Sequence, residues 1–339
     1  MHNMNEQTRS ALEEFIGREA GADRVSIKEA KLLSGGSIQE NWFIQAEVAG
    51  GAFAPELKLV VRTDSPSGVS GSHCRAEEFA LLKAAYAAGV TVPEPLWLCR
   101  DASLIGKQFF VMRFVGGIAA SHVVVRDATL GGDRRVLLER LGAELGRIHS
   151  IRPPREDLAF LPSPGSSPAL QHVARMRRFL DAHRTAHPAL EWGLRWLEIN
   201  APERGELVLC HRDFRTGNYM VDENGLAAIL DWEFSGWGDP LEDVGWFCAK
   251  CWRFGGKGEA GGVGAREDLY RGYANVTGRR LEDEDIHYWE VMAHLNWAVI
   301  AVQQAERHLS GEETSLMLAL TGHIVPELEY EILTMTEAR

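Results

Sequence analysis

One short segment, "LCHRDFRTGNYMV" at residues 209–221, constrains this chain more than any other. It places Asp213 two residues after His211 and Asn218 five residues after Asp213. Apolar runs of strand length flank the loop, and a further run, "LAAIL", ends at Asp231. The His-x-Asp-x4-Asn spacing alone is weakly specific, because Asp and Asn are common in hairpin turns. With a strand on each side and a second Asp after the next strand, the pattern becomes specific and indicates a site.

The residue types match the parts that phosphoryl transfer from a nucleotide requires. These are a carboxylate that takes the proton of the attacking hydroxyl, oxygen ligands for a metal ion, and cations for the phosphates. Asp213 is therefore the candidate base, and Asn218 and Asp231 are candidate ligands of Mg²⁺, which prefers carboxylate and phosphate oxygens. Arg215 is predicted to point its guanidinium at the transferring phosphoryl group. The competing interpretation is an ordinary hairpin turn.

The remaining pattern divides the chain at Gly116-Gly117. Residues 1–115 begin with a helix over 6–20 and continue as about five strands interrupted by one helix near 74–89. Beyond the glycines, helices are predicted at 134–150, 170–184, 188–200, 264–277, 283–308 and 312–336. We therefore expect an α+β protein with a small sheet-rich N-terminal lobe (1–115) and a larger, mostly helical C-terminal lobe (116–339) that holds the loop.

The charge narrows the possible binding partners, and the cysteine content narrows the cellular compartment. The 339 residues carry a net charge of −12, which argues against binding nucleic acid or an anionic membrane surface. The five cysteines, an odd and sparse set, are typical of reduced thiols in a cytosolic protein. The N-terminus lacks the apolar core of a signal peptide, and no apolar run approaches the roughly 20 residues that span a bilayer. We expect a cytoplasmic protein, with its oligomeric state open.

The motifs "HRDFRTGN" and "LDWEFSGWGDPLEDVGWF" together resemble those of the aminoglycoside phosphotransferase and phosphotransferase enzyme family. The resemblance runs from "LLSGGS" to the last helices and is most specific between residues 209 and 247. It extends to the branch that includes kinase domains fused to acyl-CoA dehydrogenases, which is similar in "GDPLEDVGW". The resemblance implies a bilobal, protein-kinase-like fold with an antiparallel sheet in the N-terminal lobe, and ATP and Mg²⁺ as cofactors.

The resemblance also implies roles in the N-terminal lobe. Arg62, which ends "LKLVVR", would hold the α and β phosphates, and Glu78 in "RAEEFALL" would be its ion-pair partner. Lys58 lies on the same strand face and is the rival cation, because Arg and Lys are not interchangeable at such a site. Glu77 is the rival of Glu78.

Two further segments of this lobe would contact the nucleotide. The implied phosphate cover is "LSGGSIQENW", in which Gly35 and Gly36 permit a close approach of the backbone and Ser37 and Asn41 donate hydrogen bonds. A plain hairpin turn is the alternative there. Backbone groups from Met112 to Phe114, in "VMRFVGG", would pair with adenine.

The segment after the second Asp bears on the acceptor. Eleven residues separate Asp231 from Asp243, and Ser235 is the only hydroxyl among them, so the peptide platform of protein kinases is missing. This favours a small-molecule hydroxyl acceptor. The resemblance implies that Asp243 braces the loop; His211 is expected to orient the loop and Arg212 to be structural. Four tryptophans in this region favour ordinary core, with an aromatic wall for an apolar or quaternary-ammonium substrate as the alternative. They are Trp232, Trp237, Trp246 and Trp252.

We interpret the chain as an ATP- and Mg²⁺-dependent kinase of a small metabolite, for example a hydroxyacyl thioester. Two alternatives stay open at this point: an aminoglycoside antibiotic kinase, and an ATP-binding regulator without turnover. The preference for ATP over GTP is also open.

Overall fold

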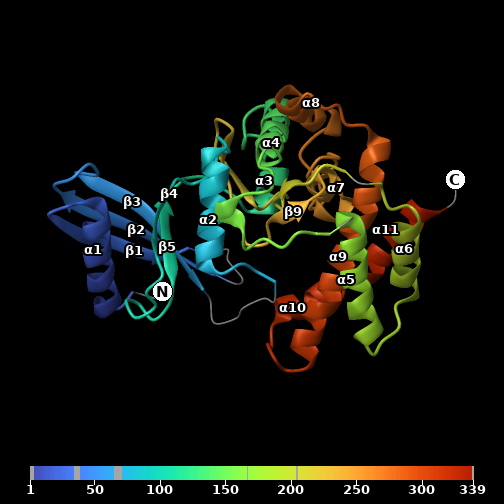
Figure 1. The fold of residues 1–339 in the computed structure, drawn as a ribbon, viewed down its shortest axis with the longest axis horizontal. Helices are drawn as coiled ribbons and strands as arrows, with labels where there is room; N and C mark the ends of the chain where they lie inside the picture. Colours follow the sequence, from blue (N-terminus) through green and yellow to red (C-terminus); the bar gives the residue numbers. More distant parts are fainter. Residues whose placement is uncertain (1–3, 34–38, 65–70, 166, 204, 338–339) are drawn as a thin grey trace.

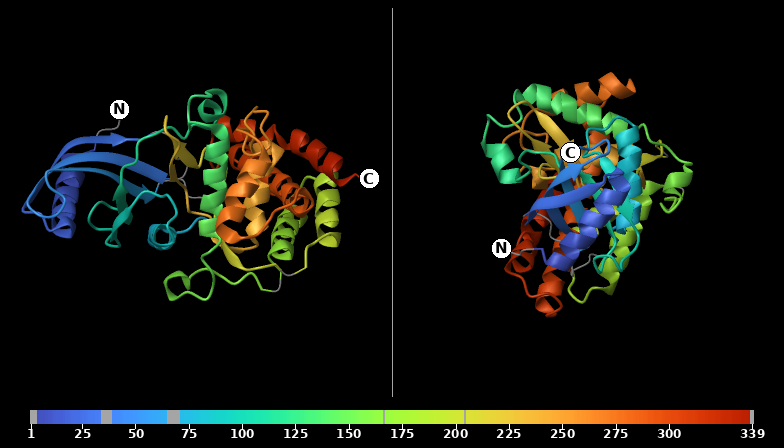
Figure 2. Two further views of the ribbon diagram at one scale, coloured as in Figure 1. Left: turned by 90° about the horizontal axis from the view of Figure 1, so that it is seen from above. Right: turned by 90° about the vertical axis from the view of Figure 1, so that its left-hand side faces the viewer.

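The computed structural model describes residues 4–33, 39–64, 71–165, 167–203 and 205–337. A five-stranded antiparallel sheet lies at one end of the long axis, and a helical body occupies the rest (Figures 1 and 2). This arrangement confirms the predicted α+β class and the predicted antiparallel sheet in the N-terminal part. The division into lobes at residues 115 and 116 stays a prediction.

The sheet has the strand order β1-β2-β3-β5-β4, and each neighbouring pair is antiparallel. Its strands are β1 (Arg24–Leu32), β2 (Gln39–Ala49), β3 (Glu56–Asp64), β4 (Pro95–Cys99) and β5 (Phe109–Arg113). Side chains alternate between the two faces of a strand. Phe109 accordingly packs on Phe15 of α1 (Glu6–Ala20), whereas Phe110 packs on Phe79 of α2 (Arg75–Ala87). The two helices therefore cover opposite faces, and α2 lies between the sheet and the helical body (Figure 1).

The helical body is built around the long helix α9, which contacts α6, α7, α10 and α11. Its helices are α3 (Ser121–Arg126), α4 (Arg134–Ile148), α5 (Pro168–Ala182), α6 (Pro188–Ile199), α7 (Pro240–Cys248), α8 (Arg266–Thr277), α9 (Asp283–Leu309), α10 (Leu316–Gly322) and α11 (Val325–Thr336). Among the helices of the described residues, none combines the length and the apolarity needed to cross a membrane.

The expectation of a single helix over 312–336 was wrong. The segment forms two helices, α10 and α11, with a break at His323 and Ile324. Pro326 stands in the first turn of α11, where its missing N–H costs nothing. In a continuous helix the same proline would remove a hydrogen bond and clash with the preceding turn, so the chain starts a new helix there.

Two short antiparallel strand pairs frame the loop at 211–218. Strand β6 (Val208–Cys210) pairs with β9 (Gly236–Gly238), and β7 (Tyr219–Val221) pairs with β8 (Leu226–Ile229). The predicted strands before and after the loop are thus present. Helix α7 begins two residues after β9, which sets its first turn directly behind the loop.

Candidate active site

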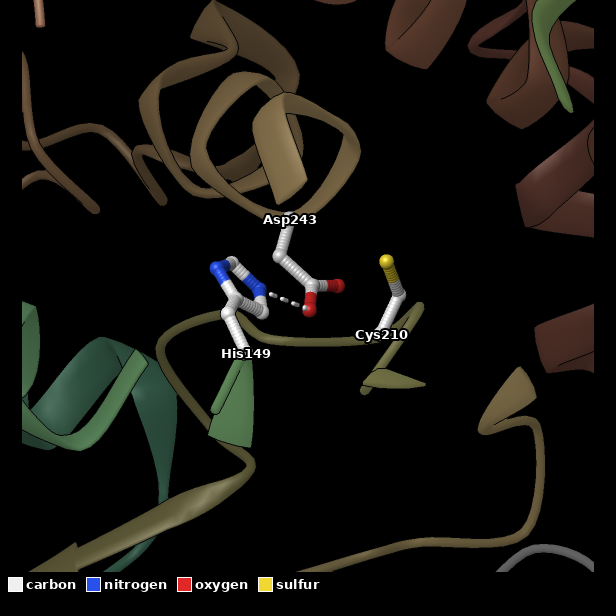
Figure 3. A group of neighbouring side chains, drawn as sticks. All are labelled: His149, Cys210 and Asp243. Atoms are coloured by element: carbon white, nitrogen blue, oxygen red, sulfur yellow. Dashed lines mark hydrogen bonds and ion pairs between the residues drawn. The ribbon is translucent and has the colours of Figure 1, made fainter. Parts of the chain in front are cut away.

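Asp243, in the first turn of α7, holds the backbone of the loop. Its Oδ2 accepts a hydrogen bond from the backbone N–H of His211, and its Oδ1 accepts one from that of Arg212, both at 2.7 Å. His149 Nε2, at 3.1 Å, contacts the same Oδ2 (Figure 3). The Asp243 side chain is fully buried, so these bonds are shielded from water. The prediction that Asp243 braces the loop is confirmed.

The group formed by His149, Cys210 and Asp243 has the compactness of a metal site, with ligand atoms within 4.8 Å of one another. Figure 3 shows the Asp243 carboxylate between the other two side chains. Both of its oxygens are already occupied by the loop. Burial also raises the pKa of Cys210 well above its ordinary value, which keeps the thiol protonated, whereas metals bind the thiolate. We interpret the group as a structural brace.

The side chains of the loop hold its shape. His211 Nε2 lies 2.8 Å from the carbonyl oxygen of Leu230, and His211 Nδ1 accepts from the backbone N–H of Asp213 at 3.3 Å. Arg212 adopts a left-handed φ of 65° and donates to the carbonyl oxygen of Trp237 at 2.7 Å. The predictions that His211 orients the loop and that Arg212 is structural are confirmed by these contacts.

The Asp213 carboxylate receives donors on both oxygens. Oδ1 accepts from Arg215 Nε at 2.9 Å and from Trp246 Nε1 at 3.1 Å. Oδ2 accepts from the side-chain amide of Asn218, which also donates to the Asp213 carbonyl oxygen at 2.9 Å. These bonds orient the Asn218 amide, and its oxygen has no partner among the described residues. The Arg215 guanidinium lies over the ring of Trp252, 4.9 Å from its centroid.

Asp231 lies next to this loop. The backbone N–H of Leu230 donates to the Asn218 carbonyl oxygen at 2.8 Å, and Asp231 itself has a left-handed φ of 69°. Burial tends to raise the pKa of Asp231, but the charge and hydrogen bond of Arg62, helped by His211 and Arg215, outweigh burial and lower the pKa. Because its pKa is lowered, the carboxylate of Asp231 is ionised at neutral pH. The side chain is 33% exposed, so the carboxylate is also accessible.

Arg62 connects the sheet to Asp231. Its guanidinium binds Glu78 at two points, Nη2 to Oε1 at 2.7 Å and Nε to Oε2 at 3.1 Å, and its Nη2 lies 2.6 Å from Asp231 Oδ1. Glu78 is also bonded to Arg75, which is buried. The predicted ion pair between Arg62 and Glu78 is confirmed, while the binding of phosphates by Arg62 stays a prediction.

The two rivals occupy other positions. Lys58 is exposed, and no ion pair of its ammonium is present within the described part of the chain. Glu77 forms a capping box at the start of α2, where its carboxylate accepts from the backbone N–H of Cys74 at 3.0 Å. Arg62 and Glu78 are therefore the pair that reaches the loop region.

The other nucleotide-lobe predictions have mixed outcomes. Gly35, Gly36 and Ser37 lie outside the described residues. Asn41 lies beside the Arg62 guanidinium, whose Nη1 is 3.4 Å from Asn41 Oδ1.

In the segment from Met112 to Phe114, two backbone N–H groups already donate hydrogen bonds to neighbouring backbone. The N–H of Arg113 donates to the carbonyl oxygen of Glu94 at 2.9 Å, and that of Phe114 donates to the carbonyl oxygen of Lys58 at 3.0 Å. Adenine pairing stays a prediction, and it cannot use these two donors without breaking sheet bonds.

A contact between Gln39 and Glu233 joins distant parts of the chain and could not be predicted from the sequence. The Gln39 side-chain amide donates to Glu233 Oε2 across 194 positions of sequence, joining β2 to the segment after Asp231. Glu233 is buried, and burial together with the nearby charge of Asp231 raises its pKa to about 8. The only available signal was the acidic residue in "LDWE", which does not identify a partner.

The four tryptophans after Asp231 are core residues rather than an open cage. Their exposed fractions lie between 2 and 7%, namely Trp232 2%, Trp237 5%, Trp246 7% and Trp252 6%. The core interpretation is confirmed. Trp246 nevertheless reaches Asp213 with its N–H, which the sequence analysis did not anticipate.

The oxygen donors around the loop fit Mg²⁺. The amide oxygen of Asn218 and the carboxylate of Asp231 belong to segments bonded to each other, and both are hard ligands of the type that Mg²⁺ prefers. A tetrahedral nitrogen or sulfur set, as zinc prefers, is not offered by these two residues.

The comparisons with known proteins agree with this geometry. Residues 29–280 match the model of the phosphotransferase enzyme family. Mouse acyl-CoA dehydrogenase family member 10 is 32% identical over 201 residues, covering 57% of this chain and 18% of that protein. Human acyl-CoA dehydrogenase family member 11 is 27% identical over 271 residues, covering 74% of this chain and 34% of that protein. The matched part is thus about a fifth to a third of these relatives.

Solved structures show the same fold. A Ralstonia eutropha protein assigned to the aminoglycoside phosphotransferases superposes with a TM-score of 0.74 at 18% identity, covering 96% of this chain and 97% of that chain. Spectinomycin phosphotransferase in complex with ADP and spectinomycin superposes with a TM-score of 0.64 at 13% identity, covering 97% and 98%. The fold is therefore that of the aminoglycoside kinases, and because the family model spans well over half of its length, the chain belongs to the phosphotransferase enzyme family.

Proposed function

We propose that this protein is an ATP- and Mg²⁺-dependent kinase that transfers the γ-phosphate to a hydroxyl of a small molecule. The observation that carries the proposal is that Asp213 and Asn218 lie on one braced loop with Asp231 beside it, and that Arg62 is bonded to Asp231. Family membership and the ADP complex of a structural neighbour support it.

In the proposed reaction, Asp213 accepts the proton of the acceptor hydroxyl as that oxygen attacks the γ-phosphorus, and the bond between the γ-phosphorus and the bridging oxygen breaks to release ADP. Asn218 and Asp231 would hold Mg²⁺, which would neutralise the charge on the phosphate oxygens. Arg62 binds the α and β phosphates and keeps its bonds to Glu78. Arg215 lies close enough to Asp213 and Asp231 to stabilise the charge that develops on the transferring group.

The segment between Asp231 and Asp243 supports a small-molecule acceptor rather than a protein. Residues 232–242 form β9 and enter α7, and most of their side chains are buried. A peptide substrate has no exposed segment to lie on there.

Charges near the base favour a neutral or anionic metabolite over an aminoglycoside. Arg215 lies against Asp213, with its guanidinium over the ring of Trp252. The neighbouring residues 250–257 add the cations Arg253 and Lys257, whereas Lys250 is paired with Glu331. An aminoglycoside is a polycation and would meet repulsion here. A hydroxyacyl thioester is one acceptor of the favoured kind.

One assay distinguishes the proposal from its two alternatives, an aminoglycoside kinase and an ATP-binding regulator without turnover. ADP release and phosphate-ester formation are measured with Mg·ATP and a panel of hydroxy acids, their thioesters and aminoglycosides. The proposal expects phosphorylation of a neutral or anionic member. Phosphorylation of aminoglycosides alone supports the antibiotic kinase, which the spectinomycin-bound neighbour suggests. Binding of Mg·ATP without any product supports a regulator without turnover.

A further inference from the structure

Among the described residues outside the loop, Trp246 donates a side-chain hydrogen bond to the Asp213 carboxylate. Its indole Nε1 lies 3.1 Å from Asp213 Oδ1, and the residue is 7% exposed. An indole N–H only donates, so the bond has one direction. A buried donor that ends on a carboxylate makes a charge-assisted hydrogen bond, which is stronger than a neutral one.

The donors on Asp213 divide unequally between its two oxygens. A carboxylate has about four acceptor positions, two on each oxygen. Oδ1 uses both, for Trp246 and for Arg215. Oδ2 uses one, for Asn218, and within the described part of the chain its other position has no donor. The acceptor hydroxyl can therefore reach the carboxylate only through Oδ2, provided that Oδ1 stays occupied.

Helix α7 supports both the backbone of the loop and the Asp213 carboxylate. Asp243 and Trp246 are three residues apart in α7, a spacing that places both on one face of a helix. Asp243 fixes the N–H groups of His211 and Arg212, and Trp246 fixes the carboxylate that follows. Gly245 lets α7 pack closely on α9, since a Cβ there would lie 2.4 Å from the Cβ of Trp289. The donor is thus carried by a tightly packed helix.

We propose that Trp246 is a positioning residue for the base: its N–H occupies Asp213 Oδ1 and leaves Oδ2 to receive the acceptor hydroxyl. This inference rests on the proposed function of Asp213 and deepens it. Trp246 takes no proton and contacts no phosphate. Its effect is confined to the orientation of the carboxylate, which determines the geometry of proton transfer.

The variant Trp246→Phe removes the N–H and keeps an aromatic ring in the site. Trp297→Phe is the matched control, because Trp297 belongs to the same aromatic cluster, packs on Trp252 with centroids 4.6 Å apart, and has no hydrogen bond to Asp213. Both variants are assayed by ADP release from Mg·ATP with the acceptor of the panel above that gives the highest turnover. If no acceptor exceeds the rate of ATP hydrolysis, water serves as the acceptor.

The expected result for Trp246→Phe is a fall in kcat of between about ten- and a hundredfold, with the KM for ATP and the thermal shift on adding Mg·ATP within twofold of the parent. Trp297→Phe keeps kcat within about twofold. In an Asp213→Asn background, Trp246→Phe has little further effect, because the two residues act as one unit. If Trp246→Phe does not fold, the benzothienyl analogue of tryptophan at position 246 replaces it, since it keeps both rings and lacks the N–H.

Equal losses in Trp246→Phe and Trp297→Phe, or the same fractional loss with and without Asp213, would overturn the positioning role. The proposed function fails separately: if Asp213→Asn retains turnover, Asp213 is not the base. An inactive Asp213→Asn combined with a fully active Trp246→Phe refutes only the role of Trp246.

Discussion

Arg62 and Asp231 form an ion pair, with Nη2 and Oδ1 2.6 Å apart, across 169 positions of sequence. The proposed phosphate cation and the proposed metal ligand are therefore bonded to each other before any nucleotide arrives. Burial would lower the pKa of Arg62, but Glu78 and Asp231 outweigh burial and raise it, so the guanidinium stays charged. Binding of Mg·ATP would exchange this contact, giving the metal to Asp231 and the phosphates to Arg62, while Glu78 keeps Arg62 in place.

Replacing Arg62 with Met should abolish most of the thermal stabilisation that Mg·ATP gives, because the phosphates lose their cation and Glu78 loses one of its partners. Lys58→Met is the control, because it changes an exposed side chain on the same strand face. Its free energy of unfolding should differ from that of the parent by no more than about 0.5 kcal/mol. Thermal unfolding with and without Mg·ATP measures both. A nucleotide shift lost in Lys58→Met and kept in Arg62→Met would reassign the cation.

Glu78→Gln should destabilise the fold by roughly 3 kcal/mol, since it leaves two buried guanidinium groups without their shared carboxylate. The neighbouring change Glu77→Gln affects a cap and a partly exposed contact with His73, and should cost about 1 kcal/mol or less. Urea unfolding at neutral pH compares the two variants. Equal losses would mean that the buried cluster is no more important to stability than the cap.

Glu242 should make stability depend on pH in acid. Burial tends to raise the pKa of Glu242, but His172, Arg212 and Arg175 outweigh burial and lower the pKa to about 2. A carboxyl with a depressed folded-state pKa stabilises the fold above its ordinary value of 4.5, and that contribution is lost as the pH falls from there toward about 2.

Glu242→Gln should therefore cost up to roughly 3 kcal/mol at pH 7, and the difference from the parent should shrink below pH 4. Chemical unfolding at pH 7 and at pH 3.5 tests this expectation. A difference that is constant over this range would show that the carboxylate charge is not what stabilises the site.

The loop and its flanking strands could be predicted because their information is local, and the brace Asp243 could be predicted from the resemblance of "GDPLEDVGW". Asp213, Asn218, Asp231 and Asp243 all lie within 35 residues, from His211 to Gly245. The choice between Lys58 and Arg62 could not be made in this way. Residues four apart in a strand share a face, and only the structure shows which of the two is buried.

The contacts that could not be predicted join residues that are far apart in the sequence. Gln39 and Glu233 lie 194 positions apart, and no local period relates them. Trp246 looks like core by every sequence criterion, and it is core, yet one atom of its ring reaches the Asp213 carboxylate. Burial and a polar contact are compatible in an indole, which is why composition and periodicity do not separate the two roles.

The most direct test of the account is Asp213→Asn, assayed for phosphate-ester formation and for thermal stabilisation by Mg·ATP. Asn keeps the size of the side chain and removes the base, so turnover should fall by about 10²–10⁴-fold while the nucleotide shift is retained. Retention of more than about a tenth of the parental kcat, with the same shift, would contradict the claim that Asp213 takes the proton of the acceptor.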